Sequence, residues 1–467
     1  MYILSRVNSP FHFLDLSIIV LYLAGVVALG LIRSKKQSPS DDDYLLSGRR
    51  LTLIPFTASL VATWYGGILG VGEFTYRYGI SNWVVFGLPY YLFALLFAFL
   101  LAGKIRQSQI TTIPDRFRDK YGAEAGIVSA VLVMILTSPA PYIFSTGIIL
   151  KLIFNIDSNV ALLLAAALSL VYIFSGGFRS VIRTDLLQFF LMFAGFAVIV
   201  ILAATQYGGF SMLKEKLPQL HLTWKGGHTS QYITVWFFIA MWTFVDPGFY
   251  QRCAAADSPA VAKRGILTAI IFWALFDFLT LTTGLYARAI LADNADPAMA
   301  LPQLGMEILP PVLLGIFFIA ILSTIMSTTD SFGFICATTL GRDIIWRLKG
   351  ETDSPVKLTK VGLLITAIIS LLLAWLLPSV VSLWYVIGTV CVPGLLVPLL
   401  ITFWADGRFV IRGVTWMMTI SATVSFAWLL AGTLQGADSP AYPLDIEPFY
   451  PGFAVSLLWS IVSGKRK

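Results

Sequence analysis

The sequence predicts an all-α protein that crosses a membrane many times. Of its 467 residues, 57% are hydrophobic and only 12% are charged, so a single water-soluble core cannot bury the apolar surface. Apolar runs of about 20 residues, the length that spans a bilayer, follow one another along the whole chain. No predicted connection between them is long enough to fold as a soluble domain. We therefore expect one transmembrane domain over residues 1–467.

Counted by apolar length, thirteen spans are expected. Their approximate boundaries are 14–33, 52–79, 82–103, 123–153, 159–177, 184–206, 231–249, 265–290, 310–339, 359–377, 382–404, 413–434 and 448–463. Most basic residues that flank the first run follow it, which is the reverse of a secretory signal. We therefore expect this run to be retained.

Charge and reactive residues exclude several classes of protein. The formal net charge is +7, but the basic residues lie singly or in pairs between apolar runs, as in membrane loops, so we expect no nucleic-acid binding. The three cysteines are far apart and show no metal-ligand spacing. The three histidines fall outside the predicted spans, and no nucleophile motif is present. We therefore do not expect an enzyme.

The distribution of basic residues predicts the orientation. If the loop that begins at Arg33 is cytoplasmic, this loop, the alternate loops after it and the C-terminal tail hold 25 of the 32 Lys and Arg residues. The opposite side holds the other seven. We expect the N-terminus outside and the C-terminus in the cytoplasm, in a plasma or inner membrane.

Glycines crowd the middle of the second span, at Gly66, Gly67, Gly70 and Gly72. Glycine weakens a helix, and unwound backbone at membrane depth is tolerated only where it lines a cavity or is buried in protein. Free carbonyls in such a break can bind a small cation. Close helix packing explains the same pattern and is favoured on the glycines alone.

The ninth span carries polar groups that hydrocarbon does not favour. Thr324, Ser327, Thr328 and Ser331 are spaced to share one helix face, and Asp330 borders that face. A charged side chain at this depth costs about 3 kcal/mol or more, so it usually has a function. Single hydroxyls more often bond to their own helix or to a neighbour. A carboxylate beside four aligned hydroxyls favours an ion site.

Three other acids have structural explanations as well as functional ones. Asp185 opens the sixth span, where the helix dipole favours a carboxylate and Thr184 is positioned to cap, so capping and function are equally open. Asp277 lies near the middle of the eighth span and is neutral, paired or substrate-facing. Glu73 has Arg77 one turn later, so we expect a structural ion pair.

Taken in order, several motifs resemble those of the sodium:solute symporter family. They are the pair Gly176 and Gly177, TDLLQ with Thr184, Asp185 and Gln188, QRCAA from Gln251, GLYARAI from Gly284, and IMSTTDS around Ser327 and Thr328. The number of spans also fits, as do LGVGEFTYRYG in the second span and TTIPDRF around Thr112, Pro114 and Asp115. Each motif is weak alone, but the ordered set covers nearly the whole chain.

The resemblance implies an inverted repeat of five plus five helices. The first repeat covers 52–206 and the second covers 231–404, with an additional helix at 14–33 and C-terminal helices over 413–463. In such folds a discontinuous helix and its symmetry mate frame the substrate, and alternating access moves one bundle against the other.

The resemblance also implies a sodium site between the second and ninth spans. The implied ligands are the backbone carbonyls of Leu60, Thr63 and Thr324 and the hydroxyls of Ser327 and Thr328. This assignment explains the hydroxyl face of the ninth span, since its oxygens replace water around a cation.

Some members of the family resemble one another in a second cation site. The matching residues are Asp185, Ser327, Asp330 and Ser331. A Ser or Thr is expected where this chain has Asp330. Either a second cation is held more strongly, or the two carboxylates share a proton.

The motifs do not identify the substrate. The pocket is expected at the break in the second span and at aromatic residues of other spans, namely Thr63, Trp64, Tyr65, Gly67, Tyr90, Tyr91, Trp242, Trp384 and Tyr385. Any one of these aromatic residues is more often packing than pocket. No Arg or Lys is predicted at mid-membrane, which argues against a purely anionic substrate and leaves a sugar, polyol, zwitterion or small cation.

We therefore expect a sodium-coupled symporter that imports a small polar organic solute by alternating access. Its expected partners are the solute, one or two sodium ions and the lipid bilayer, and no oligomer is required. A receptor or sensor with the same fold is the main alternative; it predicts an output domain or partner helix, whereas this chain ends soon after the last predicted span. A sodium-leak channel is a third interpretation and predicts flux without saturation.

Overall fold

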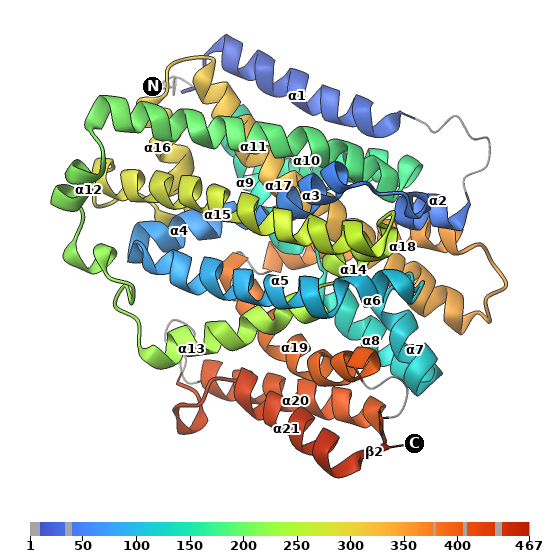
Figure 1. Ribbon diagram of the computed structural model, residues 1–467. Helices are drawn as coiled ribbons and strands as arrows, with labels where there is room; N and C mark the ends of the chain where they lie inside the picture. Colours follow the sequence, from blue (N-terminus) through green and yellow to red (C-terminus); the bar gives the residue numbers. More distant parts are fainter. Residues whose placement is uncertain (1–9, 33–39, 377–379, 405–408, 435–440, 467) are drawn as a thin grey trace, which may run out of the picture.

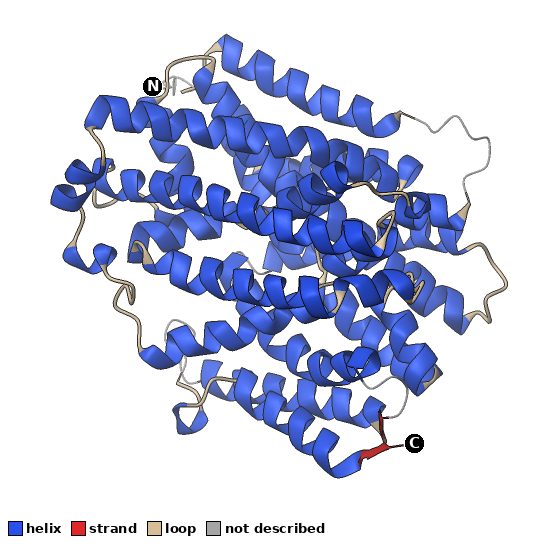
Figure 2. Cartoon of the chain, in the orientation of Figure 1, coloured by secondary structure: helices blue, strands red, loops and turns tan. Residues whose placement is uncertain are grey.

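The computed structural model describes residues 10–32, 40–376, 380–404, 409–434 and 441–466. Long helices lie side by side across the molecule (Figure 1), and the described chain is almost entirely helical (Figure 2). Eleven of the described helices are long and apolar enough to cross a membrane, and one bent pair makes a twelfth span. The predicted all-α, polytopic fold is therefore confirmed, and the count of thirteen is approximate. The predicted span 448–463 is a helix of only 15 residues.

The helices, and the short 3₁₀ or π segments marked η, are numbered along the chain. The first part comprises α1 (Phe13–Leu31), α2 (Asp41–Leu46), η1 (Ser47–Arg49), α3 (Leu53–Ala62), η2 (Thr63–Tyr65), α4 (Ile68–Tyr78), η3 (Trp83–Gly87), α5 (Leu88–Leu100), α6 (Ala102–Gln107), α7 (Ile113–Tyr121), α8 (Ala123–Leu136), α9 (Ala140–Phe154), α10 (Ser158–Gly176), α11 (Phe178–Tyr207), α12 (Phe210–Lys216) and η4 (Gln219–Leu222).

The second part follows the same pattern of long helices and short connections. It comprises α13 (Ser230–Ile239), η5 (Ala240–Val245), α14 (Pro247–Ala255), α15 (Pro259–Ile290), η6 (Pro297–Met299), α16 (Ala300–Ile308), α17 (Leu313–Thr338), η7 (Thr339–Trp346), α18 (Pro355–Leu376), α19 (Val380–Trp404), β1 (Phe409–Ile411), α20 (Val414–Thr433), η8 (Pro443–Asp445), α21 (Phe449–Ser463) and β2 (Gly464–Arg466). The two short strands pair antiparallel.

Two spans are interrupted by 3₁₀ segments. α3 and α4 are joined through η2 and bend by 57°. α13 and α14 are joined through η5, and Pro247 starts the new helix at a position that loses no hydrogen bond. Asp246 caps α14 by accepting hydrogen bonds from the backbone N–H groups of Gly248 and Phe249. The first helix of each expected repeat is therefore broken.

α17 lies at the centre of the bundle and is almost completely buried. It packs against α1, α3, α9, α10 and α11. The Asp15 carboxylate of α1 accepts hydrogen bonds from the backbone N–H groups of Val312 and Gly315, each at 2.8 Å. Because these N–H groups lie at the start of α17, the additional N-terminal helix holds this central helix in place.

α11 begins earlier than predicted. Its first residue is Phe178, so Asp185 lies about two turns inside the helix and is completely buried. The Thr184 hydroxyl donates to the carbonyls of Ser180 and Val181 in the same helix instead of capping it. The capping explanation for Asp185 is therefore wrong, because the polar residues before the apolar run are helical too.

The predicted ion pair at the end of the second span is confirmed. Arg77 Nε lies 3.0 Å from Glu73 Oε1, and both side chains are partly exposed. The spacing of one helical turn explains the contact.

Candidate functional site

The hydroxyl face of α17 lies against the break between α3 and α4. Thr328 Oγ1 donates to the Thr63 carbonyl at 2.7 Å and lies 3.2 Å from the Thr324 carbonyl. Gly66 is so close that an added Cβ would collide with the Thr328 side chain. Leu60 lies one turn before Thr63 and is also buried. Three of the predicted sodium ligands are therefore in direct contact.

Ser327, also predicted to bind sodium, contacts a carboxylate from another helix. Its hydroxyl donates to Oδ1 of Asp185 at 2.6 Å. The second oxygen of Asp185 accepts a hydrogen bond from the Ser59 hydroxyl of α3 at 2.5 Å. α11 thus places a buried negative charge beside both α3 and α17.

A buried arginine lies between these elements. Arg252 of α14 is 0% exposed, and its Nη2 donates to the hydroxyls of Thr63 and Ser331, each at 2.7 Å. Its Nε and Nη2 also donate to the Ser59 hydroxyl, at 3.1 and 2.8 Å. Nη2 lies 3.5 Å from Oδ2 of Asp185. The guanidinium therefore neutralises this carboxylate and hydrogen-bonds to the hydroxyls around it.

The position of Arg252 contradicts the expectation that no Arg or Lys lies deep in the bundle. The seventh span was predicted to end at about residue 249. In the structure a second helix, α14, continues to Ala255 and carries Arg252 into the core. The motif QRCAA contains this arginine and was the signal for it.

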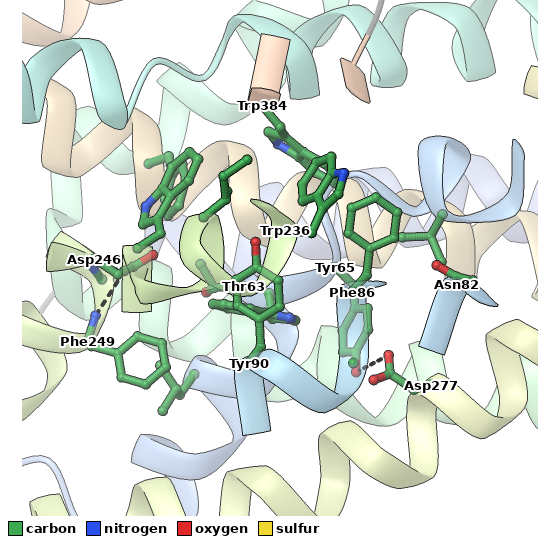
Figure 3. Close-up of a pocket in the computed structure, with 18 of the residues that line it drawn as sticks. Thr63, Tyr65, Asn82, Phe86, Tyr90, Trp236, Asp246, Phe249, Asp277 and Trp384 are labelled. Atoms are coloured by element: carbon green, nitrogen blue, oxygen red, sulfur yellow. Dashed lines mark hydrogen bonds between the residues drawn. The ribbon is translucent and has the colours of Figure 1, made fainter. Parts of the chain in front are cut away.

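A cavity of about 110 Å³ adjoins this cluster (Figure 3). Six of the nine predicted pocket residues line it: Thr63, Trp64, Tyr65, Tyr90, Trp242 and Trp384. The other three are not among the lining residues. Gly67 packs against the Trp384 ring, Tyr91 donates its hydroxyl proton to Asp277, and Tyr385 donates its own to Glu447.

Comparison with known proteins decides the family. The model of the sodium:solute symporter family matches residues 44–420. This chain belongs to the sodium:solute symporter family. The resemblance that the ordered motifs suggested is therefore confirmed.

Relatives of this symporter-family chain include transporters of several solutes. The osmoregulated proline transporter OpuE of Bacillus subtilis is 25% identical over 95% of this chain and 92% of its own length. The sodium/pantothenate symporter of Haemophilus influenzae is 26% identical over 76% of this chain and 77% of its own. Solute carrier family 5 member 4 of Rattus norvegicus is 23% identical over 79% of this chain, which covers 62% of that relative.

A solved structure shows the same fold. The substrate-bound outward-open state of a sodium-coupled sialic acid symporter matches with a TM-score of 0.79, and 97% of each chain is covered. The two sequences are 20% identical. The likeness therefore shows the transporter fold of this symporter-family chain.

Asp330 of this symporter-family chain does not join the other residues of the predicted second cation site. Its Oδ2 accepts a hydrogen bond from the Tyr172 hydroxyl of α10, and the Ser169 hydroxyl of the same helix also interacts with the carboxylate. No hydrogen bond between described residues connects it to Asp185. Ser327 instead donates directly to Asp185, and Ser331 accepts a hydrogen bond from Arg252, which pairs with Asp185.

The cavity of this family member also has residues that the sequence did not single out. Among them are Asn82, Phe86, Trp236, Asp246 and Phe249. Asp277 lines the cavity, and its carboxylate accepts hydrogen bonds from the hydroxyls of Tyr65, at 2.9 Å, and Tyr91. Its partners are thus hydroxyls rather than a cation.

Proposed function

We propose that this chain is a sodium-coupled symporter that imports a small polar organic solute by alternating access. The observation that carries the proposal is the contact between the Thr328 hydroxyl and the Thr63 carbonyl. It brings oxygens of the central helix and of a helix break within bonding distance of each other. Membership of the sodium:solute symporter family supports the same function.

The proposed sodium ligands are oxygens that the fold already gathers. They are the carbonyls of Leu60, Thr63 and Thr324 and the hydroxyls of Ser327 and Thr328. In this structure the Thr328 proton is directed at Thr63. When sodium binds, that hydroxyl has to rotate so that its lone pairs face the ion, and one hydrogen bond is exchanged for two ion–dipole contacts. The ion then ties α17 to the broken helix.

Thr63 links the proposed solute site to the proposed sodium site. It lines the cavity, and its carbonyl contacts the central helix. Solute and sodium therefore stabilise the same arrangement, and by linkage each raises the affinity for the other. Each sodium ion that moves through the membrane potential supplies about 2.3 kcal/mol per 100 mV, which drives accumulation of the solute.

At the predicted second site, a second cation has to compete with the Arg252 guanidinium. Asp185 and Ser331 both contact the Arg252 guanidinium. A second sodium ion has to displace this side chain from both residues. The proposal therefore needs only the sodium ion at the helix break.

Orientation and repeat boundaries also belong to the proposal. We place the N-terminus outside and the C-terminus in the cytoplasm of a plasma or inner membrane, with repeats over 52–206 and 231–404. The broken helices α3–α4 and α13–α14 at the start of each repeat support this division. Arg33, Lys35 and Lys36, which support the orientation, lie outside the described residues.

A stability screen tests this function. Purified protein is heated with a sugar, a polyol, a zwitterion or a small organic cation, in sodium and in potassium. We expect one class to raise the unfolding temperature, and to do so more strongly in sodium, because ligands that bind only the folded state stabilise it. The double variant Ser327→Ala and Thr328→Ala should lose this dependence on sodium. Equal effects in sodium and potassium contradict the proposal.

A further inference from the structure

A carboxylate on the cavity wall makes no ion pair among the described residues, although the buried Arg252 guanidinium also attracts it. Asp246 is 5% exposed and lines the cavity. Its Oδ1 accepts backbone hydrogen bonds from Gly248 at 2.7 Å and Phe249 at 3.2 Å. Among the described residues, no hydrogen bond reaches its Oδ2 and no ion pair includes it. Capping α14 therefore uses only one of its two oxygens.

The arginine of the cavity wall is not available to a solute. Arg252 is 0% exposed and is paired with Asp185. Its Nη1 donates to the Gly248 carbonyl at 3.4 Å, and its Nη2 and Nε donate to the hydroxyl groups described above. A carboxylate on the solute would have to break this pair. The charge that remains in the cavity is negative.

Aromatic rings form much of the wall around Asp246. Trp64 meets Tyr90 edge to face, with centroids 5.1 Å apart, and Phe249 in the same way at 6.0 Å. Tyr142 meets Phe332 edge to face at 5.6 Å. Ring faces attract cations, and the attraction grows when the cation is removed from water. In Figure 3 the Tyr90 ring lies between Asp246 on one side and Asp277 on the other.

The polar atoms of the cavity include donors as well as acceptors, since the indole N–H of Trp236 on its wall has no described partner. Asn82 is 5% exposed, and its Nδ2 donates to the Thr75 hydroxyl at 2.8 Å, whereas its Oδ1 has no described partner. The Trp384 indole N–H is taken by the Tyr142 hydroxyl at 3.0 Å. A polyol donates a hydroxyl hydrogen bond to such an oxygen but brings no positive charge to it. The carboxylate of Asp246 and the ring faces together therefore favour a solute that carries a positive charge.

The geometry points to a small organic cation as the solute, with its ammonium group beside Oδ2 of Asp246 and against the ring faces of Trp64, Tyr90 and Phe249. The cavity of about 110 Å³ limits the solute to a small one, because sites for drug-sized ligands measure about 300–1,000 Å³. This inference rests on the proposed symport and names the class of its solute.

Choline and its uncharged carbon isostere, in which a tert-butyl group replaces the trimethylammonium group, test the inference in the full chain. The unfolding temperature is titrated with each compound in sodium. We expect choline to raise it and the isostere to have no effect at the same concentrations. Asp246→Asn should keep the helix cap and the unfolding temperature without ligand, because Asn also caps, but should weaken the apparent affinity for choline at least tenfold.

Further variants and the sodium response separate the outcomes. Trp64→Leu should also lower the affinity for choline. Asp293→Asn changes a side chain that is 92% exposed, so it should leave that affinity unchanged. Equal effects of choline and its isostere, or unchanged choline affinity in Asp246→Asn, would overturn the inference. If the inference fails but sodium still stabilises the protein more than potassium does, the symport proposal stands. If choline binds but its binding does not respond to sodium, the symport proposal fails and the cation site stands.

Discussion

At the scale of single residues, the ion pair of Arg252 and Asp185 is the most consequential contact. Both side chains are 0% exposed, and Nη2 lies 3.5 Å from Oδ2. A buried pair of this kind adds little stability compared with apolar residues, but removing one partner leaves a buried charge. The pair joins α14 to α11, so it connects the second broken helix to the bundle.

We expect Arg252→Gln to lower the free energy of unfolding by about 3–5 kcal/mol, because Asp185 stays buried without its partner. Adding Asp185→Asn should recover most of the lost free energy of unfolding. As a control, Arg77→Gln breaks the partly exposed pair with Glu73 and should cost about 1 kcal/mol or less. Thermal unfolding of the purified variants measures all three effects. Similar losses in Arg252→Gln and Arg77→Gln contradict this account of the buried pair.

His221 makes stability depend on pH. It lies in η4, where burial lowers its pKa below 6.5, the hydrogen bond to the Tyr76 carbonyl opposes this shift, and Arg288 adds to it. Its Nε2 lies 2.9 Å from the Tyr76 carbonyl, and its Nδ1 is buried without a described partner. Protonation therefore creates a charged N–H group that has no acceptor.

Below about pH 6.5 the unfolded chain takes up a proton that the folded chain does not, so stability should fall as the pH falls through this range. His221→Gln removes this contribution, and its unfolding temperature should change less between about pH 7.5 and 5.5. Unfolding curves over that range measure the difference. An equally steep decrease in both proteins would show that His221 is not the group responsible.

At the scale of elements, apolar length predicts where helices lie but not where they break or begin. The glycines of the second span were compatible with a break at η2, but on the glycines alone close packing was favoured, and the discontinuous helix was expected from the family resemblance. The seventh span was predicted to end at about residue 249, but α14 continues to Ala255 beyond the break at Asp246. α11 starts at Phe178, before the apolar run, because buried polar residues also occupy its first turns. Tertiary contacts decide such cases.

Gly66 sets the distance between the broken helix and α17. An added Cβ there would collide with Thr328. We expect Gly66→Ala to lower the unfolding temperature and to weaken the stabilisation by sodium. Gly25→Ala is the matched control, since nothing lies within 4 Å of an added Cβ in α1, and it should raise stability by about 0.5–1 kcal/mol. The same response to both substitutions contradicts a steric role for Gly66.

At the scale of the whole molecule, the fold was largely predictable because hydrophobic length alone identifies spans. The candidate site was predictable only in part. The hydroxyl face of α17 follows from helical spacing, whereas its partners at Thr63 and Leu60 came from the family resemblance. Arg252 and Asp246 were missed, because their roles depend on contacts between segments that are far apart in the sequence.

The most direct test of the central claim is equilibrium binding of radioactive sodium to the purified protein. We predict saturable binding that potassium does not displace, reduced at least tenfold in the double variant Ser327→Ala and Thr328→Ala. Thr329→Ala should bind normally, because its hydroxyl donates to the Ile325 carbonyl of its own helix at 2.9 Å. Undiminished binding in the double variant, or no saturable binding in the unaltered protein, would contradict a sodium site between the helix break and α17.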